Sequence, residues 1–165
     1  MALISRYERE LIAGFLNRST PAIEPGVVLV LMPDTVAHRD LYSAAISPAL
    51  ADCGFRLTSR AEAFDSYSSL ELAVRYVNGA EVVVADVTGG NGDVLYMLGL
   101  CHGLGRNPLL ISQDPATLPL GLTLMRCVEY VDDAPGHQRL REHLARAVRV
   151  FLAAADASRR EDELQ

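Results

Sequence analysis

The residues of this chain whose side chains could do chemistry gather in one stretch, positions 80–105. A short apolar run there ends in Asp86, and a glycine-rich turn leads into a helix that begins near Asp93. Ligands of open parallel α/β sheets bind where strands end, beside helix N-termini that favour anions. The stretch therefore predicts a ligand site. The residues expected to line it are Asp86, Thr88, Asn91, Asp93, Tyr96 and Met97.

These features also have structural explanations. A carboxylate directly after four apolar residues is costly to bury without a partner, which favours a site role for Asp86, although it could simply cap the turn. The turn from Thr88 to Gly92 matches neither the GxGxxG nor the GxxxxGK(S/T) phosphate-binding pattern. Its glycines are explained equally well by backbone conformations that need positive φ.

Two further segments are expected to share this site in the topology predicted below. They are the end of the first strand, with Met32, Pro33 and Asp34, and a loop ahead of a later helix, with Ser66, Ser68 and Ser69. Hydroxyls and free amides near a helix N-terminus can hold a phosphate. Ser68 alternatively caps its helix, because Glu71 three residues later completes a capping-box pattern.

No metal site and no cofactor are predicted. The histidines have no companions at metal-ligand spacing, and His102 lies in an apolar helical pattern that favours a core position or one that supports the site. Three widely spaced cysteines, Cys53, Cys101 and Cys127, are best explained as buried free thiols in a reducing compartment. Neither a GxSxG motif nor a Cys/His dyad signature is present.

Strand and helix patterns alternate along the chain and must position these residues. Apolar runs of strand length cover 27–32, 55–59, 82–86, 108–113 and 127–131, and helical patterns cover about 3–17, 36–53, 68–78, 93–104 and 136–155. Such alternation requires right-handed crossovers. The predicted fold class is α/β: a three-layer sandwich around a five-stranded parallel flavodoxin-like sheet, with an extra N-terminal helix and the switch point between the first and third strands.

The same patterns predict boundaries along the chain. An N-terminal amphipathic helix occupies residues 1–20, the domain occupies 27–155, and 156–165 form a charged, flexible tail. Pro48 lies inside the 36–53 helix and is expected to kink it, and Gly54 is expected to end it. The segment 114–125 contains two prolines and has the composition of a loop.

Composition and charge argue against several classes of protein. A net charge of −6 and a pI near 5.1 do not fit a general nucleic-acid binder, which usually shows basic clusters. No apolar run approaches the ~20 residues of a membrane span. Charged residues near the start interrupt the apolar core that a signal peptide needs. We therefore expect a cytoplasmic protein without a membrane partner.

Several residues match, in order, the pattern of a known family. Its first strand ends in Met-Pro-Phe, and a later run reads Asn-x-Asn-Val-x-Tyr-Glu-Leu-Gly-x-x-His-x-Leu-Gly. The matching residues here are Met32, Pro33, Tyr42, Pro48, Ala49, Leu50, Ala80, Asp86, Asn91, Val94, Tyr96, Leu98, Gly99, His102, Leu104 and Gly105. On these residues the chain resembles the nucleoside 2-deoxyribosyltransferase-like family, over about residues 27–131.

The resemblance implies a flavodoxin-like core in homodimers or larger homo-oligomers, whose neighbouring subunit can help to complete each pocket. It also implies chemistry on N-glycosidic bonds of nucleosides or nucleotides, in which a glutamate attacks the anomeric carbon. Three positions depart from the pattern: Met97 replaces the nucleophilic glutamate, Asp34 an aromatic residue and Asp93 an asparagine. A thioether forms no glycosyl ester, and losing a covalent nucleophile costs on the order of 10⁴–10⁶ in rate.

We therefore expect a catalytically degenerate relative that binds a nucleoside or nucleotide, or that acts as a regulatory or assembly module. One alternative is an active N-glycoside hydrolase or transferase, with Asp93 and Asp86 as catalytic carboxylates that orient a water. Asp93 lies one helical turn before Met97, so their side chains would share a face. A second alternative is a structural assembly protein without a ligand. Filling of the core also explains Met97.

Overall fold

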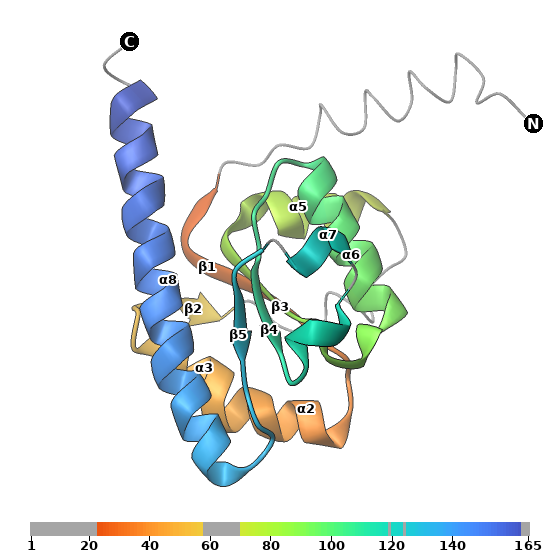
Figure 1. The fold of residues 1–165 in the computed structure, drawn as a ribbon. Helices are drawn as coiled ribbons and strands as arrows, with labels where there is room; N and C mark the ends of the chain where they lie inside the picture. Colours follow the sequence, from red (N-terminus) through yellow and green to blue (C-terminus); the bar gives the residue numbers. More distant parts are fainter. Residues whose placement is uncertain (1–22, 58–69, 119, 124, 163–165) are drawn as a thin grey trace, which may run out of the picture.

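The computed structural model describes residues 23–57, 70–118, 120–123 and 125–162 of the 165-residue chain. Its centre is a parallel sheet in which the strands pair in the order β2-β1-β3-β4-β5 (Figure 1). The strands are β1 (Glu24–Leu31), β2 (Arg56–Leu57), β3 (Ala80–Asp86), β4 (Leu109–Ser112) and β5 (Cys127–Glu129). In this order the first and third strands adjoin, as they do at the switch point of flavodoxin-like sheets.

The parallel α/β class predicted from the sequence is confirmed, but the sheet is smaller than five full strands. Among the described residues, the four strands β1, β3, β4 and β5 have three residues or more, whereas β2 has only two. The strand expected at 55–59 is reduced to Arg56–Leu57, and residues 58 and 59 lie outside the described part of the chain. Arg56 is exposed at this edge of the sheet, where a charged residue discourages further pairing.

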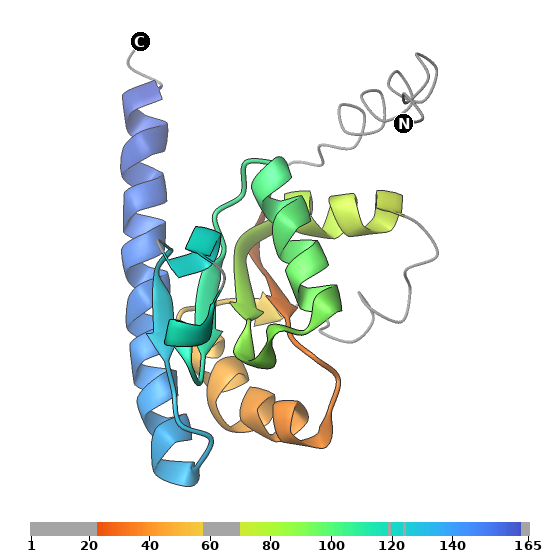
Figure 2. The same cartoon turned by 45° about the vertical axis from the view of Figure 1, so that its right-hand side comes forward.

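Helices cover both faces of the sheet. They are α2 (Val36–Leu41), α3 (Ser47–Ala51), α5 (Leu70–Gly79), α6 (Gly92–Gly103), α7 (Leu120–Thr123) and α8 (Ala134–Asp162). The buried residues of α2, α3 and α8 belong to one hydrophobic cluster and those of α5 and α6 to another. Figure 2 shows α8 and α6 on opposite sides of the sheet. The predicted three-layer arrangement is therefore present in the described residues.

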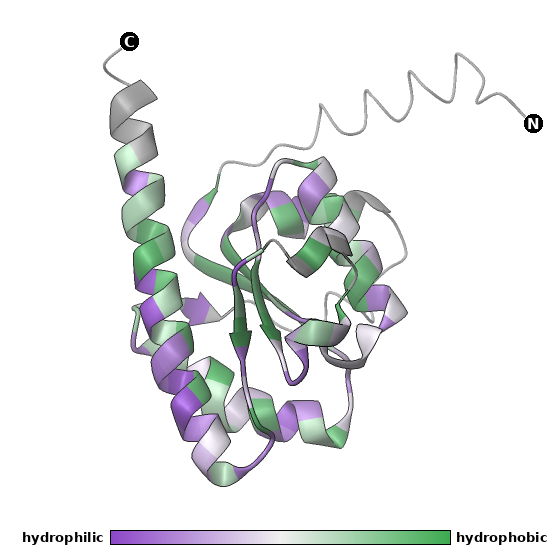
Figure 3. Ribbon diagram, viewed as in Figure 1, coloured by the Kyte–Doolittle hydropathy of each residue, from purple (hydrophilic) through white to green (hydrophobic). Residues whose placement is uncertain are grey.

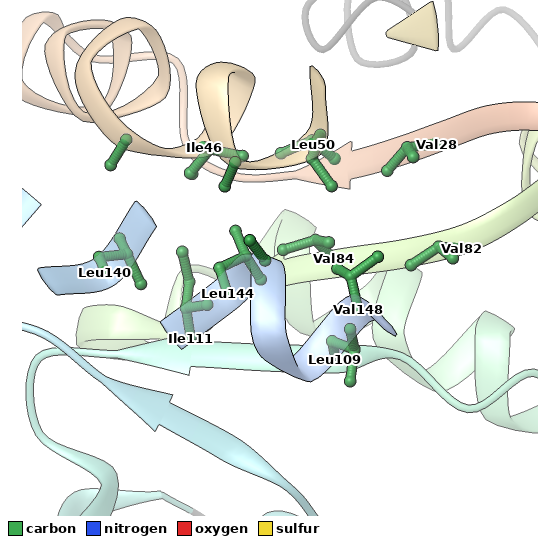
Figure 4. Close-up of a cluster of buried hydrophobic side chains, with 14 of the residues drawn as sticks. Val28, Ile46, Leu50, Val82, Val84, Leu109, Ile111, Leu140, Leu144 and Val148 are labelled. Atoms are coloured by element: carbon green, nitrogen blue, oxygen red, sulfur yellow. The ribbon is translucent and has the colours of Figure 1, made fainter. Parts of the chain in front are cut away.

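The two clusters follow from the alternation of side chains along the strands. Val28 and Val30 of β1 enter the first cluster, and Leu29 and Leu31 enter the second. Strands buried on both faces are apolar throughout, which gives the central strands the hydrophobic colour of Figure 3. Figure 4 shows the first cluster, in which Ile46 and Leu50 on one side and Leu140, Leu144 and Val148 of α8 on the other surround the valines of β1 and β3.

Pro48 changes the helix after β1 as its chemistry requires. Proline has no amide hydrogen, and its ring clashes with the carbonyl four residues earlier. The chain widens just before it into a π-helical turn, η1 (Tyr42–Ile46), in which the amide of Ser47 donates to the carbonyl of Tyr42. The expected kink is thus a wide turn between α2 and α3. Gly54, with φ of 84°, ends the segment as predicted.

Two predictions for the second half of the chain are wrong. The segment 114–125 was expected to be a loop, but it contains a 3-10 turn, η3 (Pro115–Thr117), and the short helix α7. The last helix was expected to end near 155, yet α8 continues to Asp162 and projects beyond the sheet (Figure 1). Its last residues, Ala-Ser-Arg-Arg-Glu-Asp, are mostly strong helix formers, which overrides their lack of an apolar stripe.

Some predictions fall outside the described residues. The amphipathic helix at 3–17 and the capping residue Ser68 belong to segments for which the structure gives no description. None of the described helices combines the length and apolar character that a bilayer crossing requires.

Candidate functional site

Parallel pairing brings the carboxyl ends of the central strands to one edge of the sheet. Ala85 of β3 lies opposite Leu31 of β1, and Asp86 lies opposite Ile111 of β4. Beyond β4, the amide of Tyr130 donates to the carbonyl of Ser112 at 3.0 Å. The residues that follow each strand are therefore neighbours at this edge, although they are far apart in the sequence.

A set of hydrogen-bonded side chains is built on this edge around Asp86. The Asp86 side chain is fully buried. Its Oδ1 accepts a hydrogen bond from the amide of Thr88 at 3.0 Å, and its Oδ2 accepts one from the Tyr130 hydroxyl at 2.8 Å. We call Asp86, Thr88, Gln113 and Tyr130, together with His38 beside them, the Asp86 network. The predicted cost of burying Asp86 alone is thus avoided, because both carboxylate oxygens have donors.

Gln113 and Thr88 complete the surroundings of Tyr130. The side-chain amide of Gln113 donates to the Tyr130 oxygen at 3.2 Å, and the Thr88 hydroxyl lies 3.3 Å from the same oxygen. The backbone amide of Gln113 donates to Thr88 Oγ1 at 3.1 Å. Three segments of the chain, those that follow β3, β4 and β5, are therefore joined at this edge through polar side chains.

Tyr130 acts in this network as a hydrogen-bond donor that keeps its proton. Burial, together with the negative charge of Asp86, raises the pKa of the Tyr130 phenol far above its ordinary value of 10.0. A phenol with so high a pKa is neutral at physiological pH and cannot serve as a phenolate base. Its role is to hold the Asp86 carboxylate in one orientation.

His38 brings the end of β1 to the same carboxylate. Its Nδ1 lies 2.6 Å from the hydroxyl of Thr35, the residue that caps the N-terminus of α2. Its Nε2 lies 3.8 Å from Asp86 Oδ2, too far for a hydrogen bond. Among the described side chains, His38 Nε2 is a buried polar atom without a hydrogen-bond partner. The network therefore leaves one buried nitrogen, His38 Nε2, unsatisfied beside Asp86.

The turn between β3 and α6 has the backbone that its glycines predict. Gly89 and Gly90 have φ of 68° and 65°, conformations that other residues rarely adopt. Asn91 caps α6, because its side-chain oxygen accepts hydrogen bonds from the amides of Asp93 and Val94 at 3.0 and 3.2 Å. The Asn91 side chain is thus engaged in capping. Asp93 is exposed in the first turn of α6, where a carboxylate complements the helix dipole.

Two residues expected to line the site are instead part of the core. Met97 is only 1% exposed and packs in the hydrophobic cluster between α6 and the sheet, so its expected place facing an open crevice is wrong. The physical reason is the helical period: Val94, Met97, Leu98 and Cys101 form the stripe of α6 that faces the sheet. Met32 is likewise buried, in the cluster on the other face. Core filling is the correct interpretation of Met97.

Other expected residues lie near the surface at or beside this edge. Tyr96 is 62% exposed on α6. Asp34 is exposed and forms an ion pair of 2.8 Å with Arg39, and Pro33 before it is partly buried.

His102 is exposed in the last turn of α6, so the core position expected for it is wrong. Ser66, Ser68 and Ser69 lie outside the described residues.

Sequence reasoning missed three members of the Asp86 network: His38, Gln113 and Tyr130. The signal was present for two of them, because Gln113 and Tyr130 follow β4 and β5 just as Asp86 ends β3. The rule that ligands bind where parallel strands end, which selected Asp86, would have selected Gln113 and Tyr130 as well. His38 depends on the cap of α2 by Thr35, which no strand pattern reveals.

The described cysteines are poorly suited to act as nucleophiles. Cys101 is buried, Cys53 and Cys127 are partly buried, and all three are free. Burial raises the pKa of the Cys101 thiol to about 12 and, with Asp86 and Glu129 nearby, that of Cys127 to about 11. Such thiols are poor nucleophiles. No group of three potential metal ligands occurs among the residues that the structure describes.

Two of the grooves among the described residues lie outside the contact between His38 and Asp86. One of about 510 Å³ lies where β4 and β5 begin, beside Val150 and Phe151 of α8. Another of about 490 Å³ runs along the outer edge of β5 and is lined by Tyr130, Arg139 and His143, among others. Both grooves are alternatives to the contact between His38 and Asp86 as locations for a ligand.

Comparison with known proteins gives no assignment of this site. No protein-family model matches the chain, and no curated protein matches it. Its interpretation therefore depends on the geometry described above.

Proposed function

We propose that this protein binds a nucleoside or nucleotide where β1 and β3 end, and that it does not break the glycosidic bond. The observation that carries the proposal is the approach of His38 Nε2 to Asp86 Oδ2, 3.8 Å apart, which joins the ends of the first and third strands through a network with one unpaired donor. Crevices at this switch point are where ligands of such sheets bind.

Exposed Tyr96 supports a ligand that contains an aromatic base. It projects from α6, three residues after Asp93, and so belongs to the outer face of the helix that follows the site turn. Aromatic side chains stack on nucleobases, and such stacking contributes about 1–3 kcal/mol per base.

The absence of glycosidic cleavage follows from the positions of Met97 and Asp86. Position 97 carries no carboxylate and lies in the core. Both oxygens of Asp86 already accept hydrogen bonds, so this residue orients its neighbours and does not attack a substrate. Asp93 is exposed in the first turn of α6, and none of the hydrogen bonds described above holds its carboxylate in the position of a general base.

The proposal extends to the finer expectations from the sequence. These are a catalytically degenerate relative of the nucleoside 2-deoxyribosyltransferase-like family, with a flavodoxin-like sheet, in a cytoplasmic homodimer or larger homo-oligomer. The strand order and the site at the end of β3 support this relationship.

Calorimetric titration with purine and pyrimidine nucleosides, their 5′-phosphates and NAD tests the proposal. We expect at least one member to bind, and Tyr96→Ala to weaken that binding by about tenfold or more, because stacking is lost. Tyr76→Ala on α5 is the matched control and leaves the affinity unchanged. Chromatography of the same mixtures should detect no free base. Released base would support the alternative N-glycosidase, and absence of any binding would support the assembly protein.

A further inference from the structure

The unsatisfied contact between His38 and Asp86 has a defined hydrogen-bonding character. The Asp86 carboxylate offers only acceptors, so a bare nitrogen lone pair of His38 facing Oδ2 would be repelled. The hydrogen of the imidazole therefore belongs on Nε2. Nδ1 then accepts from the Thr35 hydroxyl, which is 2.6 Å away and itself accepts from the His38 amide at 3.3 Å. This arrangement places a donor, Nε2–H, opposite an acceptor, Oδ2.

The separation of these two atoms fits one bridging oxygen. At 3.8 Å, Nε2 and Oδ2 are too far apart to bond directly. A single oxygen about 2.8 Å from each would satisfy both, provided that it accepts from one and donates to the other. A hydroxyl group has this character, whereas a phosphate oxygen or a carbonyl cannot donate to Oδ2.

The rest of the network is already satisfied, which confines the ligand to this position. The Tyr130 hydroxyl donates to Oδ2 and accepts from Gln113, and Thr88 Oγ1 accepts from the Gln113 amide. The Asp86 side chain is fully buried, whereas that of His38 is 18% exposed. Nε2 of His38 has almost no exposed surface of its own. A ligand hydroxyl therefore reaches Nε2 and Oδ2 only if the imidazole, on the short helix α2 beside exposed Thr35 and Val36, shifts outward.

We propose that His38 and Asp86 together receive one sugar hydroxyl of the ligand: Nε2–H donates to the hydroxyl oxygen, and the hydroxyl hydrogen goes to Oδ2. This inference depends on the proposed function, since it specifies which part of the nucleoside is recognised. His38 is then the residue that distinguishes a ribose from a deoxyribose. Asp86 and Thr35 hold it in the required tautomer and orientation.

Titration of the full chain with ribonucleosides and their 2′-deoxy and 3′-deoxy counterparts tests the proposal. For the nucleoside that binds, removal of one of the two hydroxyls should weaken binding about 10- to 100-fold, the effect of losing a hydrogen bond to a charged group. In His38→Ala the ribonucleoside should bind more weakly, and the ratio between ribose and deoxyribose forms should fall, because the bond from Nε2 is lost while the bond to Oδ2 remains. His143→Ala, an exposed histidine of α8, is the matched control and should leave that ratio unchanged.

The outcomes separate the two proposals. Binding of a nucleoside with equal affinity for all three sugars, or a ratio that survives His38→Ala, would overturn the hydroxyl position while leaving the proposed function intact. Absence of binding across the panel would overturn both. Nitrogen-15 NMR of the free protein adds an independent readout, since His38 should carry its hydrogen on Nε2. An imidazole with its hydrogen on Nδ1 would lack the donor and would contradict the inference.

Discussion

At the scale of single residues, this site is organised by a carboxylate that holds its neighbours in place. Asp86 is buried with donors on both oxygens, and Tyr130 supplies the donor that comes from farthest along the chain. Such an arrangement makes individual hydroxyl groups matter for stability. Met97, the residue to which the family resemblance pointed, contributes instead to the packing of the hydrophobic core.

Removing the Tyr130 hydroxyl should destabilise the fold. Tyr130→Phe keeps the ring but leaves Asp86 Oδ2 without its 2.8 Å donor, and an unsatisfied buried group costs about 1–3 kcal/mol. Urea denaturation measures this loss in the free energy of unfolding. Tyr96→Phe, at an exposed tyrosine, is the control and should change stability by less than about 0.5 kcal/mol. Equal stability of the two variants would mean that Asp86 does not need this partner.

Replacing Met97 by glutamate should damage the fold and not restore catalysis. The side chain is enclosed by the cluster that contains Leu29, Leu31 and Val94, whose buried members are all apolar. An uncompensated buried charge costs on the order of 3–5 kcal/mol. Thermal melting should show this loss for Met97→Glu, whereas Met97→Leu should cost less than about 1.5 kcal/mol. A stable Met97→Glu protein that releases free base would contradict the buried position of residue 97.

At the scale of elements, the strands and helices follow local sequence signals more closely than the site does. The bounds of β1, β3 and α6 lie within a few residues of those that periodicity predicts, because buried strands and an amphipathic helix have distinct patterns. Short elements were predicted less well: α7 and the π-helical turn before Pro48 were missed, because they are too brief to show a period, and β2 is shorter than the strand expected at 55–59. The Asp86 network was predicted only in part, because His38 and Tyr130 come close to Asp86 only through tertiary packing.

Glycines in two helices should respond oppositely to the same substitution. A Cβ on Gly136, in the first turn of α8, would collide with the backbone carbonyl of Val131, whereas a Cβ on Gly99 in α6 would meet open space. Gly136→Ala should therefore destabilise the protein, and we expect a loss of more than about 1 kcal/mol. Gly99→Ala should stabilise it by up to about 1 kcal/mol, from higher helix propensity.

Calorimetric unfolding of the two alanine variants beside the parent chain measures both effects. The opposite signs provide the control, since a general intolerance of helical substitutions would lower both melting temperatures. A Gly136→Ala variant as stable as the parent would show that the turn from β5 into α8 is looser than the contacts at Val131 indicate.

At the scale of the whole molecule, burial of titratable groups couples folding to pH. The pKa of Cys101 is raised to about 12 and that of Cys127 to about 11, both from 9.0, and that of the Tyr130 phenol is raised from 10.0. In each case burial is the largest cause, because it disfavours the charged form. The folded chain therefore binds more protons than the unfolded chain at alkaline pH.

The free energy of unfolding should consequently fall as pH rises from about 9 to 12. Stability from these groups is fully present below the unfolded pKa of 9.0 and is lost as pH passes through the raised values. Urea midpoints at intervals of one pH unit from 8 to 11 measure the slope, and Tyr130→Phe should make it shallower. A midpoint that stays constant or rises over this range would contradict the burial of these groups.

Binding of a nucleoside or nucleotide where β1 and β3 end is the function proposed for this molecule. Amide chemical-shift mapping by NMR, with the nucleoside that binds in calorimetry, tests it most directly. We predict that the shifts concentrate at residues 34–39 and 86–93, on either side of the contact between His38 and Asp86. Shifts confined to the groove beside Leu109 and Val150, or to the outer edge of β5, would contradict it.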